Sequence, residues 1–351
     1  MQNFPSKKLV IPEKLEKISG KPLVLLFYDG FERKAEPGLI GGIKSDSRRF
    51  LRYAKRSLCK QQVRTGFYTA FLALVNSLKT VGCDVRINNF AAARKRPHYP
   101  IGIAGYPSVI EKITLPNPII FGPGDFGTPP ASVAVAKDYR FKLLIQPSDW
   151  FSNMYRPFCG NKMLTWFAGI DTESWRDYSK ETKCLDYIVY DKIRWHREQR
   201  VPNILERITR HLESNGRNYV ILRYGHHHHS EFQNALKRAR AMIFICEHET
   251  QGLAYQEALS SNVPVLAWDE GEMVDPILKP YMTDALDISS VPYFSEKCGM
   301  KFKIADFEKT CDSFWQNLVG FEPRNYVKTH LSLELSAKQY LEAYASIMSN
   351  T

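Results

Sequence analysis

The sequence predicts an α/β protein of two domains, each with a mainly parallel sheet covered by helices on both faces. Three observations lead to this prediction. The chain has 351 residues, and domains commonly contain about 100–200 residues. Short apolar runs alternate with segments whose apolar residues have helical spacing, which is typical of parallel sheets. The alternation occurs twice in succession, so we expect two such domains facing each other across a cleft.

The first alternating series begins with residues 23–28 (LVLLFY), a continuous apolar run that ends at the turn Asp29-Gly30. Such a run predicts a buried strand. Residues 67–79 have helical apolar spacing and are followed by Gly82, a residue typical of helix ends. Further strands are expected at residues 84–88, 101–104, 118–121 and 142–146.

The second series begins after residue 170 and shows the same alternation. Strands are expected at residues 185–190, 219–224, 241–246 and 263–268. Helices are expected at residues 203–215, 230–240 and 252–260. We therefore expect an N-terminal domain of residues 1–160, a C-terminal domain of residues 161–325 and a tail of residues 326–351. An amphipathic helix at residues 332–348 of the tail is expected to pack back on the N-terminal domain.

The composition indicates a globular protein. Hydrophobic residues make up 44% of the chain and charged residues 24%, which argues against disorder and against a disulfide-stapled miniprotein. The net charge of +11 favours an anionic partner, such as nucleic acid, a membrane surface or a phosphorylated small molecule. The seven cysteines form no CxxC pair, and residues 1–21 lack the apolar core of a secretory signal. We expect a cytoplasmic protein, either soluble or peripheral at the inner face of a membrane.

The most informative stretch, residues 241–271, runs from a buried strand into a polar loop and a helix. Glu249 lies in the loop, Gly252 opens the helix, and Glu257 follows about two turns later. Free N–H groups at a helix start bind phosphate, and open α/β sheets bind ligands at this edge. Glu249 could accept hydrogen bonds from sugar hydroxyls, and Glu257 could reach a ribose diol. Alternatively, both glutamates are ordinary exposed residues of a helix start.

The spacing of these glutamates resembles the E-x7-E motif of retaining GT-B glycosyltransferases of the family-4 type. In that family the motif reads E-x-F-G-x4-E and is followed by A-x-A-x-G-x-P-V. The matching residues here, in the same order, are Glu249, Gly252, Glu257, Ala258, Pro264 and Val265. The sequence departs at Gln251, where the family has Phe, and at Asn262, where it has Gly. The resemblance implies the GT-B fold, with two Rossmann-like domains facing each other across a cleft.

Two weaker matches support the resemblance. Residues 169–172 (GIDT) resemble the family's G-V-D-T turn after the first domain. Lys192 and Arg197 stand five apart after a strand, as the family's two cations do in the reverse order. Two cations at a strand end would neutralise a diphosphate leaving group, and Arg194 is a competing candidate for this role. An exposed surface position is the alternative for each of these cations.

The resemblance implies transfer of a sugar from a nucleotide-diphospho-sugar to an acceptor hydroxyl, with retention at the anomeric carbon. In this picture Glu249 orients the sugar while the cations stabilise the departing diphosphate. The residues implied in catalysis are Glu249, Lys192 and Arg197. The residues implied in donor binding are Glu257, Gly252, Thr250, Gln251 and Arg194.

The first domain is expected to hold the acceptor. Gly42 belongs to a loop after the first strand, where the family has glycines near the donor phosphates. Gly124 and Asp125 belong to the segment FGPGDFG, which follows a later strand and would face the cleft. We assign these three residues to acceptor binding. The alternative is a plain glycine-proline turn with a capping aspartate.

No D-x-D triplet occurs in the chain, so we expect neither a metal nor another cofactor, and cationic side chains would replace a metal clamp. The run 226–229 (HHHH) could bind a metal, but an exposed loop is the alternative. Basic residues recur every four positions at Arg48, Arg52, Arg56, Lys60 and Arg64. On a helix they would form a stripe that favours anionic lipid, which would suit a lipid-linked, lipopolysaccharide or polysaccharide acceptor. A solvated helix face is the alternative.

Two other classes of protein remain open at this point. One is a catalytically silent scaffold with the same fold. The other is a nucleic-acid-binding protein, but the basic residues are spread along the chain and no helix-turn-helix, RRM or zinc motif occurs. We therefore expect no nucleic-acid partner. A glycosidase is disfavoured because both carboxylates lie on one side of the expected cleft rather than flanking a bond.

Overall fold

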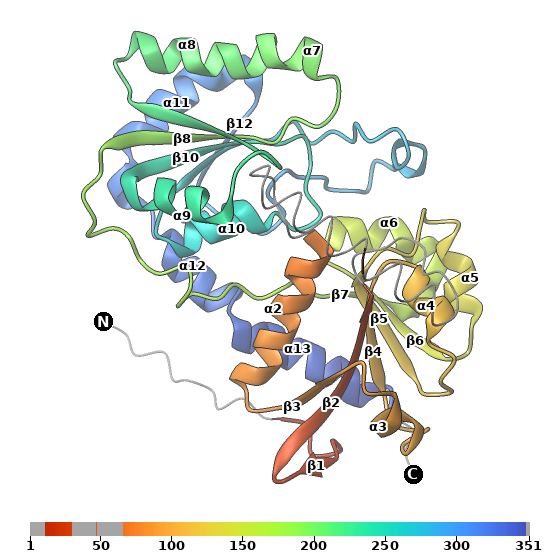
Figure 1. The fold of residues 1–351 in the computed structure, drawn as a ribbon. Coiled ribbons are helices and arrows are strands. Elements are labelled where there is room, and N and C mark those ends of the chain that lie inside the picture. Colours follow the sequence, from red (N-terminus) through yellow and green to blue (C-terminus); the bar gives the residue numbers. More distant parts are fainter. Residues whose placement is uncertain (1–10, 30–46, 48–65, 349–351) are drawn as a thin grey trace.

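The chain folds into two α/β domains, each built around its own sheet (Figure 1). The structure is a computed structural model, and it describes residues 11–29, 47 and 66–348. Gly42 and the basic stripe at Arg48, Arg52, Arg56, Lys60 and Arg64 lie outside these residues. Within the described ranges, no helix is both long and apolar enough to span a bilayer.

The first domain contains a mainly parallel sheet. Its strands are β1 (Lys17–Ile18), β2 (Lys21–Asp29), β3 (Asp84–Ile87), β4 (Ile101–Gly105), β5 (Ile119–Gly124), β6 (Phe141–Gln146) and β7 (Met163–Thr165). The order runs β2-β4-β5-β6-β7, and β2 also pairs in parallel with β3 and antiparallel with β1. Its helices are α2 (Gly66–Thr80), α3 (Phe90–Arg94), α4 (Ser108–Lys112), α5 (Ser132–Lys137) and α6 (Asp149–Cys159).

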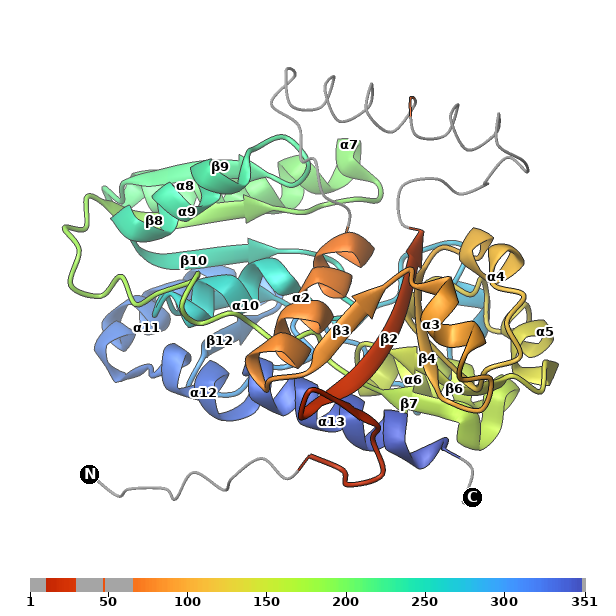
Figure 2. The same ribbon diagram turned by 60° about the horizontal axis from the view of Figure 1, so that its bottom comes forward.

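The second domain contains a parallel sheet in the order β12-β11-β10-β8-β9. Its strands are β8 (Leu185–Asp191), β9 (Tyr219–Arg223), β10 (Ala239–Ile245), β11 (Val265–Trp268) and β12 (Gly299–Phe302). Its helices are α7 (Arg197–Arg200), α8 (Glu206–Ser214), α9 (His229–Arg238), α10 (Leu253–Ser260), α11 (Phe307–Gln316) and α12 (Pro323–His330). Helices α8 and α11 cover one face, and α9 and α10 cover the other (Figure 1). The strands of this sheet point toward the first domain (Figure 2).

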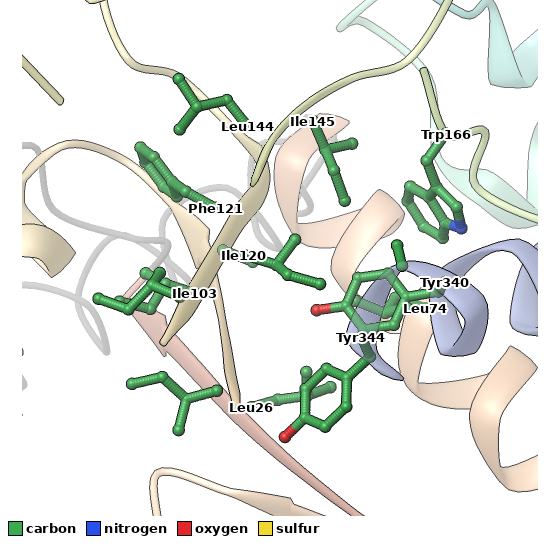
Figure 3. Packing of buried hydrophobic residues seen from close by; sticks show 14 of the residues in the cluster. Leu26, Leu74, Ile103, Ile120, Phe121, Leu144, Ile145, Trp166, Tyr340 and Tyr344 are labelled. Carbon is green, nitrogen blue, oxygen red and sulfur yellow. The ribbon is translucent and has the colours of Figure 1, made fainter. Parts of the chain in front are cut away.

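The last helix, α13 (Leu333–Ser346), lies beside α2 on one face of the first sheet (Figure 2). Tyr340 and Tyr344 are fully buried among aliphatic side chains of the strands, as Figure 3 shows. The hydroxyl of Tyr344 accepts a hydrogen bond from the backbone N–H of Leu25 (3.0 Å) and donates to the carbonyl of Pro100. Because both rings are buried in the first domain's hydrophobic cluster, the end of the chain is part of that domain's core.

A long segment between β11 and β12, residues 269–298, also crosses to the first domain. Met273 and Ile288 are buried in the first domain's hydrophobic cluster, and the ring of Tyr281 lies 6.4 Å from that of Phe158 in α6. The hydroxyl of Tyr293 donates to the carbonyl of Pro147 (2.6 Å). The two domains are therefore joined by several contacts besides the chain connection at residues 166–184.

The predicted strands are all present, although their ends differ by a few residues. The single helix expected at residues 203–215 is instead a π-helical turn at Val201–Leu205 followed by α8. Pro202 lies in that turn and has no N–H to donate, which is consistent with the irregularity. Several short elements were not predicted, because helices of five or six residues are too short to show a period. They include α3, α4 and α5, as well as the four-residue strand β12.

Gly299, at the start of β12, lies directly against the backbone of the neighbouring strand β11. Its φ is +143°, and an added Cβ would overlap the carbonyl oxygen of Val265 on the neighbouring strand. We expect Gly299→Ala to lower the free energy of unfolding by more than about 3 kcal/mol, because the clash involves backbone that cannot rotate away. Urea unfolding followed by circular dichroism measures this change.

Gly320 provides the matched control, since a Cβ there meets nothing within 4 Å. We expect Gly320→Ala to change the free energy of unfolding by no more than about 0.5 kcal/mol. Equal effects of the two substitutions would contradict the pairing of β11 with β12.

Candidate active site at the edge of the second sheet

The candidate site lies at the carboxyl ends of β8 and β10, which are neighbours in the sheet but not in sequence. From β8 the chain passes outward to β9 and then returns to the other side of β8 to form β10. Ile245 and Asp191, the last residues of β10 and β8, are paired in register. The loops that follow them therefore start side by side. Open α/β sheets bind ligands where the strand order reverses in this way.

Glu247 fastens these two loops together. Its carboxylate accepts hydrogen bonds from the backbone N–H groups of Arg194 (3.1 Å) and Trp195 (3.1 Å), and it lies 3.6 Å from the guanidinium of Arg200. The side chain is buried, so these bonds replace its lost water. Glu247 was not among the site residues predicted from the sequence. The sequence feature that could have identified it is an acidic residue directly after a buried strand.

Lys192 and Glu249 form a buried ion pair across the two loops. Only 12% of the Lys192 side chain and 8% of the Glu249 side chain are exposed. Burial opposes both charges and is the largest single effect on the pKa of Lys192, but Glu249, Cys246 and Tyr224 together outweigh it and raise that pKa. In the same way, Lys192 and then Arg194 lower the pKa of Glu249 against the effect of burial. Both residues are therefore charged at neutral pH, and the structure brings these two predicted site residues together.

The other two cations of this loop differ in their surroundings. Arg197 donates to the buried carboxylate of Asp191 (2.9 and 2.7 Å) and to the carbonyl of Ile193 (2.7 Å). These bonds hold its guanidinium at the end of β8. Arg194 donates to the carbonyl of His248 (3.1 Å) and lies 4.2 Å from the centre of the Trp195 ring. The positive charge of Arg194 also helps to lower the pKa of Glu249.

Gly252 and Glu257 lie on either side of the start of α10. Gly252 has a φ of +83°, and an added Cβ would overlap the ring of Tyr255. The glycine is thus required by the backbone and by packing, independently of any ligand. Glu257 is half-buried, and its burial raises its pKa to about 8. Burial, followed by the charge of Glu257, also raises the pKa of Tyr190 in β8, which indicates that the two side chains are close.

The raised pKa of Glu257 makes stability depend on pH. Below its ordinary value of 4.5 the carboxyl is protonated in both the folded and the unfolded state. Between 4.5 and about 8 the unfolded chain loses this proton and the folded protein keeps it, so the free energy of unfolding falls as the pH rises. We expect Glu257→Gln to increase the free energy of unfolding by on the order of 1–3 kcal/mol at pH 8 and to change it little at pH 5. Urea unfolding at both pH values measures the difference.

Glu322, an exposed residue before α12, provides the control for this prediction. Glu322→Gln is expected to leave the free energy of unfolding unchanged at both pH values. The same gain for Glu257→Gln at pH 5 and pH 8 would show that its carboxyl does not titrate in this range.

Gln251 and Thr250, which were assigned to the donor, differ in burial. The side-chain amide of Gln251 accepts from the N–H of Ala168 (2.9 Å) and donates to the carbonyl of the same residue (2.7 Å). It also donates to Gln256 (3.0 Å). Gln251 thus ties the loop to the connection between the domains, whereas Thr250 is half-buried. The role of both residues in donor binding stays a prediction.

The first domain meets this loop through α6. The indole N–H of Trp150 donates to the backbone carbonyl of Glu249 (3.0 Å). Gly124 ends β5, and the carboxylate of Asp125 accepts from the N–H of Gly127 (2.8 Å), as a turn-capping aspartate does. Both residues lie at the carboxyl end of the first sheet. The assignment of Asp125 to the acceptor stays a prediction.

The histidine run follows β9. The buried ring of His227 contacts the hydroxyl of Tyr190 (3.3 Å) and the carbonyl of His228 (3.2 Å). His228 precedes α9, and its N–H donates to the carboxylate of Glu231 (3.0 Å). Among the described residues, no three His, Cys, Asp or Glu side chains gather as metal ligands would.

Comparison with known proteins identifies the fold. No family model matches the chain, and no curated protein matches its sequence. Sucrose-phosphate synthase from Thermosynechococcus elongatus is similar in structure (TM-score 0.58, 10% identity, 94% of this chain and 100% of that chain). So is a glycosyltransferase from Rickettsia africae (TM-score 0.52, 12% identity, 94% and 100%). AviGT4, a glycosyltransferase involved in avilamycin A biosynthesis, is also similar (TM-score 0.51, 12% identity, 94% and 99%).

These similarities extend over nearly the whole chain, and therefore over both domains. The protein has the GT-B fold, with two Rossmann-like domains facing each other, and the fold class predicted from the sequence is confirmed. At 10–12% identity the likeness concerns the fold. The chemistry has to be argued from the site itself.

Proposed function

We propose that the protein is a glycosyltransferase that moves a sugar from a nucleotide-diphospho-sugar to an acceptor hydroxyl. The observation that carries this proposal is the buried pair of Lys192 and Glu249 at the reversal of strand order. A buried ion pair adds little to stability and is weak evidence for a structural role. Charged groups at a ligand-binding edge of the sheet are typical of active sites. The glycosyltransferases that share the fold support the same reading.

The proposed donor site explains why both charges are kept. The side chains of Lys192 and Arg194 are the cations that would face the diphosphate. The backbone N–H groups at the start of α10 would donate further hydrogen bonds to it. Negative charge grows on the diphosphate as the sugar leaves, so fixed cations would stabilise the transition state more than the ground state. Glu249 holds Lys192 in place and would orient the sugar. Glu257 would hold the ribose, and Arg197 would act through Asp191.

The finer parts of the proposal follow from the motif and from the charges. Because cationic side chains are available for the diphosphate, we propose transfer without a metal. The E-x7-E spacing supports retention at the anomeric carbon, with the acceptor bound by the first domain. A saccharide or lipid-linked acceptor in cell-surface polysaccharide, lipopolysaccharide or glycolipid synthesis would suit the basic residues at 48–64. A cytoplasmic protein at an anionic membrane surface is the corresponding proposal for its location.

The experiment that tests this function is a donor screen. The purified protein is heated with UDP-glucose, UDP-galactose, GDP-mannose or ADP-glucose, each in the presence of EDTA. A donor that binds the native state raises the melting temperature by mass action. We expect at least one donor to do so and to release its nucleoside diphosphate slowly, with water or added saccharide as acceptor. NMR of the first sugar product should show the donor's anomeric configuration. If no donor of this panel binds and none is turned over, the proposal is overturned.

A further inference from the structure

His248 precedes Glu249 in the loop after β10, and its ring is buried. The residue is 3% exposed. Neither Nδ1 nor Nε2 has a partner among the residues that the structure describes. Buried polar atoms of native proteins are nearly always paired, so an unpaired ring at this place calls for an explanation. Burying two such atoms destabilises the fold, and a ligand that pairs with them would recover the loss.

The ring is held between two indoles, one from each domain. Trp195, from the loop after β8, stacks on it with ring centres 4.8 Å apart and planes at 29°. Trp150, from α6 of the first domain, meets it at 6.2 Å and 78°. Burial, followed by the charge of Arg194, lowers the pKa of His248 to about 4, so the ring is neutral at pH 7. A neutral imidazole offers one N–H donor and one acceptor nitrogen.

We propose that His248 is a specificity-determining residue that exchanges hydrogen bonds with a hydroxyl of the donor's sugar. The inference rests on the proposed function. A hydroxyl both donates and accepts, as a neutral imidazole does, whereas a diphosphate is better matched by Lys192 and Arg194. Aromatic faces beside the ring suit the apolar C–H face of a sugar. Because Trp150 belongs to the first domain, movement of α6 away from the second domain would uncover the ring.

The test measures discrimination between donors that differ by one hydroxyl. Wild type and His248→Phe are assayed with the donor that the panel above identifies and with its 2-, 3-, 4- and 6-deoxy analogues. Phenylalanine keeps the stacking on both indoles and removes both nitrogens. We expect wild type to disfavour one analogue at least about tenfold in kcat/KM, the size of one neutral hydrogen bond. At that position His248→Phe should discriminate no more than about twofold.

His211→Phe provides the control. His211 lies in α8, near the amino ends of the strands, and its ring contacts Asp312 (2.9 Å). This variant should keep the wild-type pattern across all analogues. If His248→Phe keeps the wild-type pattern too, or if wild type accepts every deoxy analogue equally, the inference is overturned. If no donor of the panel binds, both the proposed function and this inference are overturned.

A measurement on the wild-type protein covers the case in which the Phe variant does not fold. The side-chain nitrogens of ¹⁵N-histidine-labelled protein are followed by NMR during titration with each nucleotide-sugar and with its nucleoside diphosphate alone. The His248 signals keep the neutral-ring shift to pH 5, and a His227→Gln variant separates them from those of His227, whose pKa burial also lowers. We expect the nucleotide-sugar to shift them and the nucleoside diphosphate to leave them unchanged. Equal shifts by both ligands would overturn a contact with the sugar.

Discussion

Glu249→Gln is expected to lower kcat/KM for the donor by about 10²–10³-fold, the usual effect of removing one fixed charge or hydrogen-bond partner at a transition state. The amide keeps the shape of the side chain but removes the negative charge that positions Lys192. It also replaces an oxygen acceptor by a donor group. Release of nucleoside diphosphate by the variant and by wild type, under identical conditions, measures the change.

The control for this prediction is Glu111→Gln, at an exposed position in α4 of the first domain. It should turn over the donor at the wild-type rate. Circular dichroism at 20 °C should show that both variants are folded. A folded Glu249→Gln with wild-type turnover would show that the site assignment is wrong and would favour a catalytically silent scaffold.

The fold could be predicted largely from local sequence signals. β2 and β10 are continuous apolar runs of the length of a strand, and α2 has a clear helical period. These patterns are set by burial, which acts on each segment separately. The strand order of the two sheets depends on contacts far apart in the sequence, and the sequence alone left it open. The GT-B arrangement was reached through the motif around Glu249 rather than through periodicity.

The site could be predicted only in part, for the same physical reason. The sequence indicated Lys192 and Glu249, but their contact depends on the register between β8 and β10. Their spacing in the sequence gave Lys192 and Arg197 the same predicted role. In the structure Lys192 pairs with Glu249, whereas Arg197 pairs with a different carboxylate. Arg197 opens α7, and its guanidinium lies against Asp191, the last residue of β8. A buried carboxylate at a strand end could have indicated that partner.

Lys192→Met is expected to lower the free energy of unfolding by about 3–5 kcal/mol at pH 8, because it leaves the charge of Glu249 buried and unpaired. Methionine retains the length and most of the volume of the lysine stem, so lost packing contributes little. Without the lysine, burial would raise the pKa of Glu249 and its carboxyl would take up a proton at lower pH. The loss should therefore be smaller at pH 5 than at pH 8. Urea unfolding at both pH values measures it.

The double variant Lys192→Met with Glu249→Gln separates the pair's role in stability from its role in turnover. Removing both charges together leaves no unpaired ion, so most of the stability lost in Lys192→Met should return. Turnover should nevertheless stay at least about 10²-fold below wild type, because no cation then faces the diphosphate from this position. A stable, inactive double variant would mean that the ion pair is retained for chemistry. If the double variant is no more stable than Lys192→Met, the lysine acts through packing, for example on the ring of Tyr224, which lies 4.4 Å from its Nζ.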